Sequence, residues 1–233
     1  MELRINGNES YYFSNSAYKN DSLIMDSHRK KITLVRTAPN EPLLTDRILK
    51  DYINPNEIKS VVNLNTTKYS VIDDRKMDWK IMPETDNFLG YRIQKAITNF
   101  AGRNWIAWFT KEIPINDGPY KFKGLPGLII KIQDSKNQHS FTLSGIKNSS
   151  SNFQYPTTEI ERGILSLNQS DFEKLYKNYR SNPVADLEGK IPDQPDQYGN
   201  MRTGSEILRE FKEKEIKRIS KENNLIEIDL LKL

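Results

Sequence analysis

The feature that most constrains the fold is a series of short apolar segments in the middle of the chain, separated by turns. These segments are residues 79–82, 91–97, 105–113, 128–132 and 140–146. Turn signals rich in Asn, Asp and Gly fall in the breaks between them, and three of the four breaks are shorter than the dozen or more residues that a crossover connection between parallel strands needs. The spacing therefore predicts an antiparallel meander. In residues 105–113 apolar side chains alternate on both faces, which predicts a strand buried on both sides.

Further strands are predicted on the N-terminal side of this region. Residues 2–13 alternate and then turn, and residues 60–64 and 68–72 have the pattern of paired strands. Residues 14–42 are polar apart from one short apolar stretch, and residues 45–53 suit a short helix or a loop. Hydrophobic residues make up only 36% of the chain, but aromatic residues, at 10%, each bury a large area. We expect a modest core with long polar loops.

The composition changes near residue 147. Beyond it, periodic apolar residues predict short helices near 170–179 and 205–223, followed by a terminal strand at 225–231. We therefore expect a mainly β protein of the α+β class, with an antiparallel sheet and two short C-terminal helices. The predicted organisation is a single domain over 1–233, with an antiparallel β core in 1–147 and a loop-rich part in 148–233.

Charge and cysteine content exclude several classes of protein. The 35 basic and 31 acidic residues give a net charge of +4 and are mixed along the chain. Nucleic-acid binders usually gather basic residues in a stripe, so no nucleic-acid partner is predicted. The chain has no cysteine, which excludes disulfides, thiolate catalysis and Cys-ligated zinc. No apolar run approaches the roughly 18 residues of a membrane span, so no transmembrane segment is expected. No signal peptide opens the sequence, and we expect a leader to have been removed.

The residues before the segment 128–132 are turn formers. Gly124 and Gly127 flank Leu125 and Pro126, and proline in a sheet is confined to edges, bulges and strand starts. This pattern predicts a bulged strand entry that delivers the apolar segment into the core. Because glycine also lets another backbone approach closely, the same four residues are candidates for binding a ligand or a partner.

Aromatic residues provide a second set of binding candidates. Trp105 and Trp108 lie on opposite faces of a regular strand, so at least one belongs to the core, while the other suits the wall of an apolar groove. The residues that we expect to contribute to such a groove are Trp79, Trp105, Trp108, Phe109, Phe122 and Leu125. Arg103 precedes this strand; it suits an ion pair with Asp117 or Asp134, or an anion site.

Residues 124–129 read Gly-Leu-Pro-Gly-Leu-Ile. This is the motif that names the GLPGLI family of secreted Bacteroidetes proteins, which the chain resembles over about 70 residues. The flanks that resemble the family are residues 78–81, 90–96, 102–109 and 113–119, with weaker matches at 3–13 and 213–227. One departure is that Arg92 follows Gly90-Tyr91 where the family often has Cys, so any metal or redox role of that Cys is absent.

The resemblance implies export to the periplasm or outer membrane, or secretion, and a curved antiparallel sheet of half-barrel or barrel-like form. It implies little chemistry. Both histidines, His28 and His139, fall in predicted loops, and the sequence contains no Gly-x-Ser-x-Gly elbow and no phosphate-binding loop. We therefore assign no catalytic residue, metal ligand or cofactor.

The predicted function is that of an exported cell-envelope binding or accessory protein without a catalytic site. Its expected occupant is an apolar ligand, a peptide or an outer-membrane protein. Two alternatives stay open. One is an envelope hydrolase that acts on peptides or glycans, with a site not visible in the sequence. The other is a structural partner of an outer-membrane complex.

Overall fold

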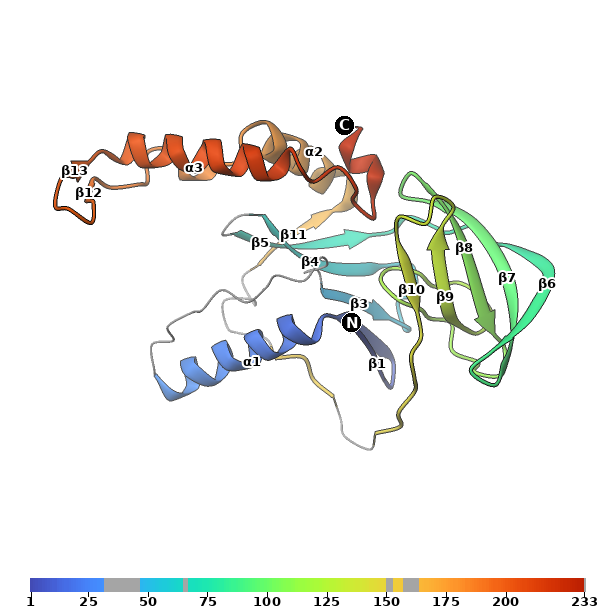
Figure 1. Ribbon diagram of the computed structural model, residues 1–233. Coiled ribbons are helices and arrows are strands. Elements are labelled where there is room, and N and C mark those ends of the chain that lie inside the picture. Colours follow the sequence, from blue (N-terminus) through green and yellow to red (C-terminus); the bar gives the residue numbers. More distant parts are fainter. Residues whose placement is uncertain (32–46, 65–66, 150–152, 157–163, 233) are drawn as a thin grey trace. The chain divides into compact units, whose positions relative to one another are not determined.

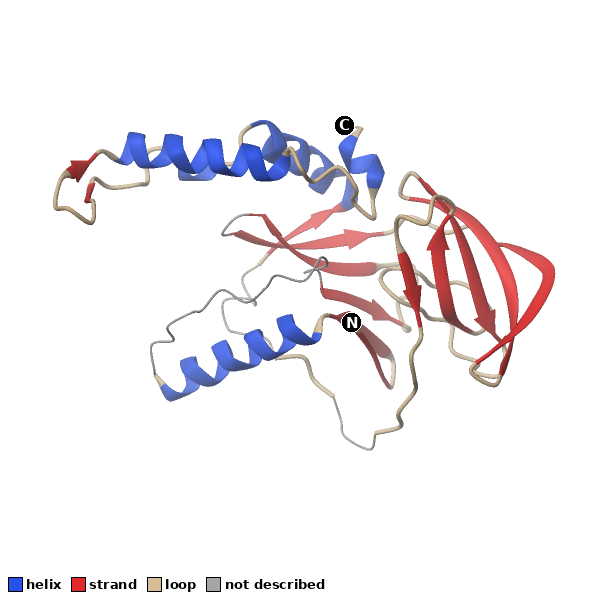
Figure 2. Ribbon diagram, viewed as in Figure 1, coloured by secondary structure: helices blue, strands red, loops and turns tan. Residues whose placement is uncertain are grey.

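The computed structural model describes residues 1–31, 47–64, 67–149, 153–156 and 164–232. Within these residues the chain forms two compact units, Met1–Gln169 and Ser170–Leu233. Three sheets and three α-helices are present, and β-structure dominates the first unit (Figures 1 and 2). The predicted mainly β, α+β class is confirmed.

A six-stranded sheet, here called sheet A, forms one half of the first unit. Its strands, in spatial order, are β1 (Glu2–Asn6), β2 (Glu9–Phe13), β3 (Arg47–Asp51), β4 (Ile58–Leu64), β5 (Thr67–Asp73) and β11 (Leu165–Asn168). All pairs are antiparallel except β5 with β11. The helix or loop predicted for residues 45–53 is wrong over its described part. Pairing with β2 and β4 on both sides makes this stretch a strand, and Ile48 and Lys50 alternate into the interior.

The predicted meander forms a second sheet, sheet B. Its strands, in spatial order, are β10 (Ser140–Thr142), β9 (Leu128–Asp134), β8 (Arg103–Thr110), β7 (Tyr91–Phe100) and β6 (Lys80–Phe88). Every neighbouring pair is antiparallel, as the short turns predicted. The half-barrel or barrel-like form is not confirmed, because the described strands divide between separate sheets and close no barrel.

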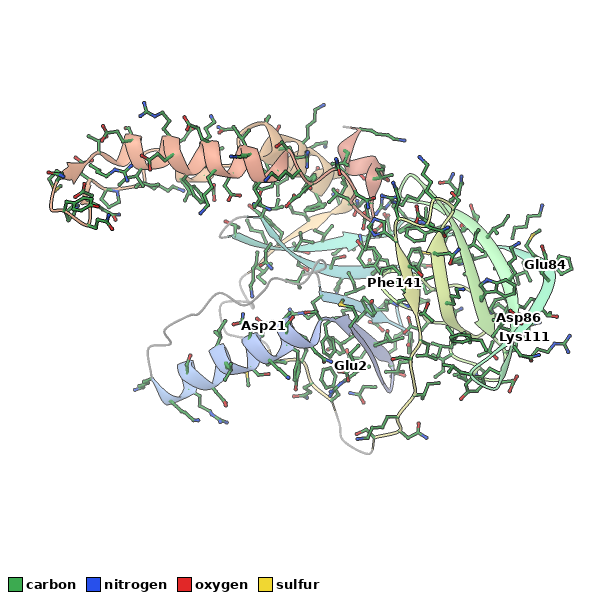
Figure 3. All side chains as sticks on the ribbon, viewed as in Figure 1. Glu2, Asp21, Glu84, Asp86, Lys111 and Phe141 are labelled. Atoms are coloured by element: carbon green, nitrogen blue, oxygen red, sulfur yellow. The ribbon has the colours of Figure 1, made fainter. Side chains whose placement is uncertain are left out.

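The core of the first unit lies between the two sheets. Tyr12 of β2 contacts Phe141 of β10, with ring centroids 6.2 Å apart, and Phe141 lies between the sheets in Figure 3. Phe122 then links Phe141 to Trp105 of β8, with centroid distances of 6.5 and 4.6 Å. Aromatic rings thus join sheet A to the buried face of sheet B, in keeping with the expectation that large rings offset the low hydrophobic content.

The opposite face of sheet A is covered by helix α1 (Asn15–Lys30) and the segment 153–155. Tyr18 of α1 and Phe13 of β2 pack against Phe153 and Tyr155, and Arg4 lies 4.3 Å from the centroid of the Phe153 ring. The polar stretch 14–42 gave no prediction of a helix. Apolar residues in α1 show little helical periodicity. Tyr18 makes the aromatic contact of α1 with this cluster.

The second unit is built on α2 (Gln169–Ser181), which starts one residue before the unit boundary, and α3 (Gly204–Ile219). Its smaller elements are η2 (Ala185–Leu187), the β12–β13 hairpin (Gln194–Pro195, Met201–Arg202) and η3 (Ile228–Leu231). A capping box of Thr203 and Glu206 starts α3, and Arg180 donates to the carbonyls of Ile219 and Glu222 at its end.

The two predicted C-terminal helices are confirmed, with ends that differ by a few residues. The strand predicted at 225–231 is wrong, because its last residues form the short 3₁₀ helix η3. Among the described helices, none combines the length and the apolar character needed to cross a membrane.

Candidate functional site

The Gly-Leu-Pro-Gly motif ends the segment 111–127, which connects β8 to β9. Leu125 is buried, Gly124 and Pro126 are exposed, and Gly127 is buried directly before β9. Gly127 has a φ of +149°, and a Cβ there would lie 2.0 Å from the carbonyl oxygen of Thr110. The motif therefore gives β9 a close approach to β8 that only glycine permits.

A buried ion pair fixes this segment to strand β3. Lys50 and Asp117 are both fully buried, and the Lys50 Nζ donates to Asp117 Oδ1, to the Gly118 carbonyl at 2.6 Å and to the Phe122 carbonyl at 3.3 Å. The hydroxyl of Tyr52 donates to the other Asp117 oxygen at 2.6 Å. Burial lowers the pKa of Lys50, but its three protons each meet an oxygen acceptor, so we treat the pair as ionised. Burial alone would raise the pKa of Asp117. The positive charge of Lys50 and the hydrogen bond from it outweigh burial, so the pKa of Asp117 is lowered.

A second buried cluster fixes the segment to strand β5. Lys121 Nζ donates to Asp73 Oδ2 at 2.8 Å, and Arg75 donates to both Asp73 oxygens at 2.7 and 2.9 Å. Burial alone would raise the pKa of Asp73, but the hydrogen bonds from Arg75 and the charges of Lys121 and Arg75 lower it to about 2. Two charged residues of the segment 111–127, Asp117 and Lys121, thus fix this segment to strands β3 and β5 of sheet A.

The Asp73 cluster makes stability depend on pH. A carboxyl whose folded-state pKa is depressed to about 2 contributes stability that is present above its ordinary pKa of 3.8 and is lost as pH falls toward 2. The shift corresponds to roughly 2 kcal/mol. We expect the Asp73→Asn variant to be less stable than the parent at pH 7 and to lose less stability between pH 5 and pH 2, measured by urea unfolding. An equal pH slope in both proteins would show that Asp73 is not the group that titrates.

Arg103 is held inside the protein by an ion pair. Its NH1 group donates to Asp134 Oδ2 at 3.0 Å and to Gln138 Oε1 at 2.7 Å, and its side chain is buried. Of the two acidic partners suggested by the sequence, Asp134 is therefore the one that it pairs with. The guanidinium closes the turn between β9 and β10, where the same Asp134 accepts from the backbone of Gln138 and His139.

Most of the candidates for the apolar groove lie in the core. Trp105, Phe109, Phe122 and Leu125 are at most 1% exposed, so they pack between the sheets and line no surface groove. The reason is the alternation of β8, which turns Trp105 and Phe109 toward sheet A. Trp79 is half-buried and donates from Nε1 to the Lys123 carbonyl at 2.7 Å, which fixes the approach to the motif.

Trp108 is the candidate that faces outward. It projects from the face of sheet B opposite to the core, here called the outer face of sheet B, and it is half-buried. The register places Lys95 of β7 and Lys131 of β9 directly across from it on either side. The ring packs against the cluster that contains Ile93 and Leu128. A row of two lysines around one tryptophan therefore crosses the middle of this sheet.

The next row on the same face is apolar at its centre and polar at its ends. Ile97 of β7 pairs with Ile106 of β8, and these are flanked by Lys80 of β6 and Gln133 of β9. All but Lys80, which is exposed, are half-buried, so this face is in contact with solvent. The sequence offered no means to find these neighbours of Trp108, because cross-strand register depends on turn geometry and bulges.

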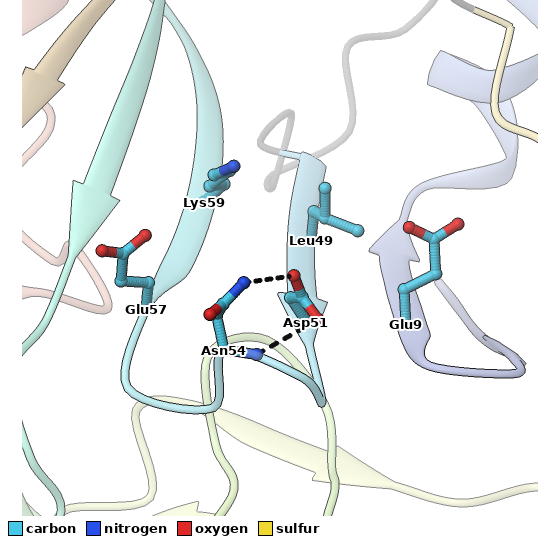
Figure 4. Close-up of a pocket in the computed structure, with 6 residues that line it drawn as sticks. All are labelled: Glu9, Leu49, Asp51, Asn54, Glu57 and Lys59. Carbon is cyan, nitrogen blue, oxygen red and sulfur yellow. Dashed lines mark hydrogen bonds between the residues drawn. The ribbon is translucent and has the colours of Figure 1, made fainter.

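A shallow pocket on sheet A offers a different environment. Six residues line it: Glu9, Leu49, Asp51, Asn54, Glu57 and Lys59 (Figure 4). Asp51 is already engaged, because it accepts from the backbone and side-chain nitrogens of Asn54 at 3.3 and 3.2 Å. In the part of the chain that the structure describes, no group of three or more acidic or histidine side chains is arranged to hold a metal ion.

Comparison with known proteins gives a short family match. The family model described as "Protein of unknown function (Porph_ging)", a Bacteroidetes-associated family, matches residues 100–131. This stretch includes the Gly-Leu-Pro-Gly-Leu-Ile motif, although the matching model does not carry the GLPGLI name. No curated protein matches the chain.

Among solved structures, the chain is similar to PNGF-II in two crystal forms. Both show 16% sequence identity, with TM-scores of 0.47 in the C2 form and 0.46 in the P21 form. The similarity covers 75% of this chain but 29% of the PNGF-II chain, so the chain spans less than a third of that protein's length.

Proposed function

We propose that this protein is an exported, non-catalytic binding protein of the bacterial cell envelope, and that it binds through the outer face of sheet B. The observation that carries this proposal is the position of Trp108. Tryptophan is one of the residue types enriched at the energetic centre of binding surfaces. Here it lies on the solvent side of a five-stranded sheet, between two lysines.

The non-catalytic part of the proposal rests on how the ionisable groups are used. Lys50, Asp73, Asp117 and Lys121 are buried and engaged with one another or with backbone carbonyls, so they hold the segment 111–127 in place. Export is supported by the resemblance to the secreted GLPGLI family, and the bacterial source by the match to a Bacteroidetes-associated family model.

Native mass spectrometry of the chain purified from the envelope of its own host tests the proposal. We expect a reproducible bound species that is absent from the Trp108→Ala variant. Tyr198→Ala is the matched control, because Tyr198 is an aromatic residue of the second unit with 79% of its surface exposed. A clean unbound mass for the parent protein, or a species retained by Trp108→Ala, would count against this face as the binding site.

A further inference from the structure

We propose that the outer face of sheet B binds an acidic polysaccharide, with Trp108 stacked on a sugar ring and Lys95 and Lys131 beside the sugar's carboxylates. This inference rests on the proposed function and names the class of ligand for the same face.

Trp108 and the two lysines across from it, Lys95 and Lys131, form one row on the outer face of sheet B. Directly opposed residues on neighbouring strands have Cβ atoms about 5 Å apart. The register Lys95–Trp108–Lys131 therefore places one ammonium stem on each side of the indole. Because the ring packs against the Ile93 and Leu128 cluster of the sheet, it is supported from within. An aromatic ring held in this way suits stacking against a flat ring that carries negative groups at its edge.

The charges on the outer face of sheet B are unevenly distributed. Among the described residues, Lys80 and Lys131 make no ion pair, while Lys95 pairs with Glu84 at a distance of 3.2 Å. The carboxylates near this face, Glu84 and Asp86, both belong to the edge strand β6, and Figure 3 shows them at the far margin of the sheet. A third carboxylate, that of Glu112 just after β8, accepts a hydrogen bond from the backbone N–H of Arg92 at the start of β7. Positive charge from Lys95 and Lys131 therefore flanks Trp108, and an anionic ligand is favoured over the middle of β8 and β9.

The remaining surface of this face, outside the row that contains Trp108, is partly apolar and partly polar. Ile97 and Ile106 are already half-buried by their neighbours, so they offer little further apolar area for a protein partner. A standard protein interface buries about 1,600 Å² around an apolar centre. The rest of the face carries the amides of Asn99, Asn104 and Gln133, and toward the β6–β7 turn it carries the half-buried rings of Phe88 and Tyr91. Amides, ammonium groups and a single indole match the hydroxyls, carboxylates and ring faces of an acidic sugar.

The experiment is a titration of the full chain with polygalacturonate oligomers, with the same oligomers methyl-esterified, and with dextran. Tryptophan fluorescence and calorimetry serve as readouts. The ester keeps the sugar ring and removes its charge, so it is the matched control on the ligand side. We expect the acidic oligomer to bind, with an affinity that falls as salt is added, and the ester and dextran to bind at least about tenfold more weakly.

Variants locate the binding on the protein. We expect Trp108→Ala to weaken binding of the acidic oligomer at least about tenfold, as for a central aromatic contact, and Trp108→Phe to retain part of it. Lys131→Ala is expected to weaken binding several-fold at low salt and less at high salt. Lys59→Ala is the control, because Lys59 is an exposed lysine of sheet A.

The outcomes separate this inference from the proposed function. Equal binding of the acidic oligomer and its ester would overturn the acidic class, while dependence on Trp108 would leave the face as a binding site. Binding that is insensitive to Trp108→Ala would overturn both. If no polysaccharide binds, or if anionic vesicles or single-stranded DNA bind more tightly, the ligand class is wrong, and the host-derived species then decides whether the face is used at all.

Discussion

Replacing Gly127 with alanine is expected to destabilise the first unit severely, by at least about 3 kcal/mol, because no room exists for a side chain. The added Cβ would lie 2.0 Å from the carbonyl oxygen of Thr110 and 2.7 Å from its carbonyl carbon. These are backbone atoms of β8, and Thr110 pairs with Leu128, so they cannot move without opening the start of β9. The φ of +149° is also one that L-residues rarely adopt.

Urea unfolding followed by tryptophan fluorescence measures this effect selectively. Trp79, Trp105 and Trp108 are the three tryptophans of the chain, and all belong to the first unit. Their emission therefore reports on the unit that contains Gly127 and not on the helical unit that follows it.

Two other glycines separate the steric effect from the backbone effect. At Gly145 a Cβ would meet nothing within 4 Å and φ is not positive, so Gly145→Ala is expected to change stability by less than about 0.5 kcal/mol. Gly90 also has open space, but its φ is +83°, so Gly90→Ala is expected to cost about 1–2 kcal/mol. If Gly127→Ala costs no more than Gly90→Ala, then the close approach of β9 to β8 does not control folding.

Local patterns in the sequence predicted much of sheet B. Alternation in residues 105–113 placed Trp105 and Trp108 on opposite faces, and the turn signals between segments predicted the antiparallel order, although the segment 111–127 between β8 and β9 is longer than a turn. The strand β3 was missed because Lys50 interrupts its apolar pattern, and lysine is rarely buried without a partner. That partner, Asp117, lies 67 residues away, and no local pattern can indicate such a contact.

The candidate site was predicted only in part, for a related reason. Trp108 was expected to face either the core or a groove, and the structure places it on the outer face of sheet B. Lys95 and Lys131 were not expected beside it, because their proximity depends on register, and a bulge shifts the register between β8 and β9. The other apolar candidates are buried for two reasons. The alternation of β8 turns Trp105 and Phe109 inward, and the segment 111–127, held by its buried charges, places Phe122 and Leu125 in the core.

Removing one charge of the Lys50–Asp117 pair is expected to cost about 3–5 kcal/mol, which is the usual cost of leaving a buried charge without its partner. Asp117→Asn keeps the size of the side chain but removes the negative charge that faces the Lys50 ammonium. Both side chains are 0% exposed, so water cannot replace the lost partner. We expect a lower urea midpoint in tryptophan fluorescence, with little change in the second unit.

A double variant shows that the cost comes from the unpaired charge. In Lys50→Met/Asp117→Asn no buried charge remains, so its loss of stability is expected to be smaller than the sum of the two single losses by about 1–3 kcal/mol. Asp26→Asn removes one partner of the exposed pair with Arg29, whose atoms are 3.0 Å apart, and should cost at most about 1 kcal/mol. If the single losses add in the double variant, Lys50 and Asp117 stabilise the fold independently. The segment 111–127 would then be held by its apolar contacts, mainly those of Phe122 and Leu125, and not by its charges.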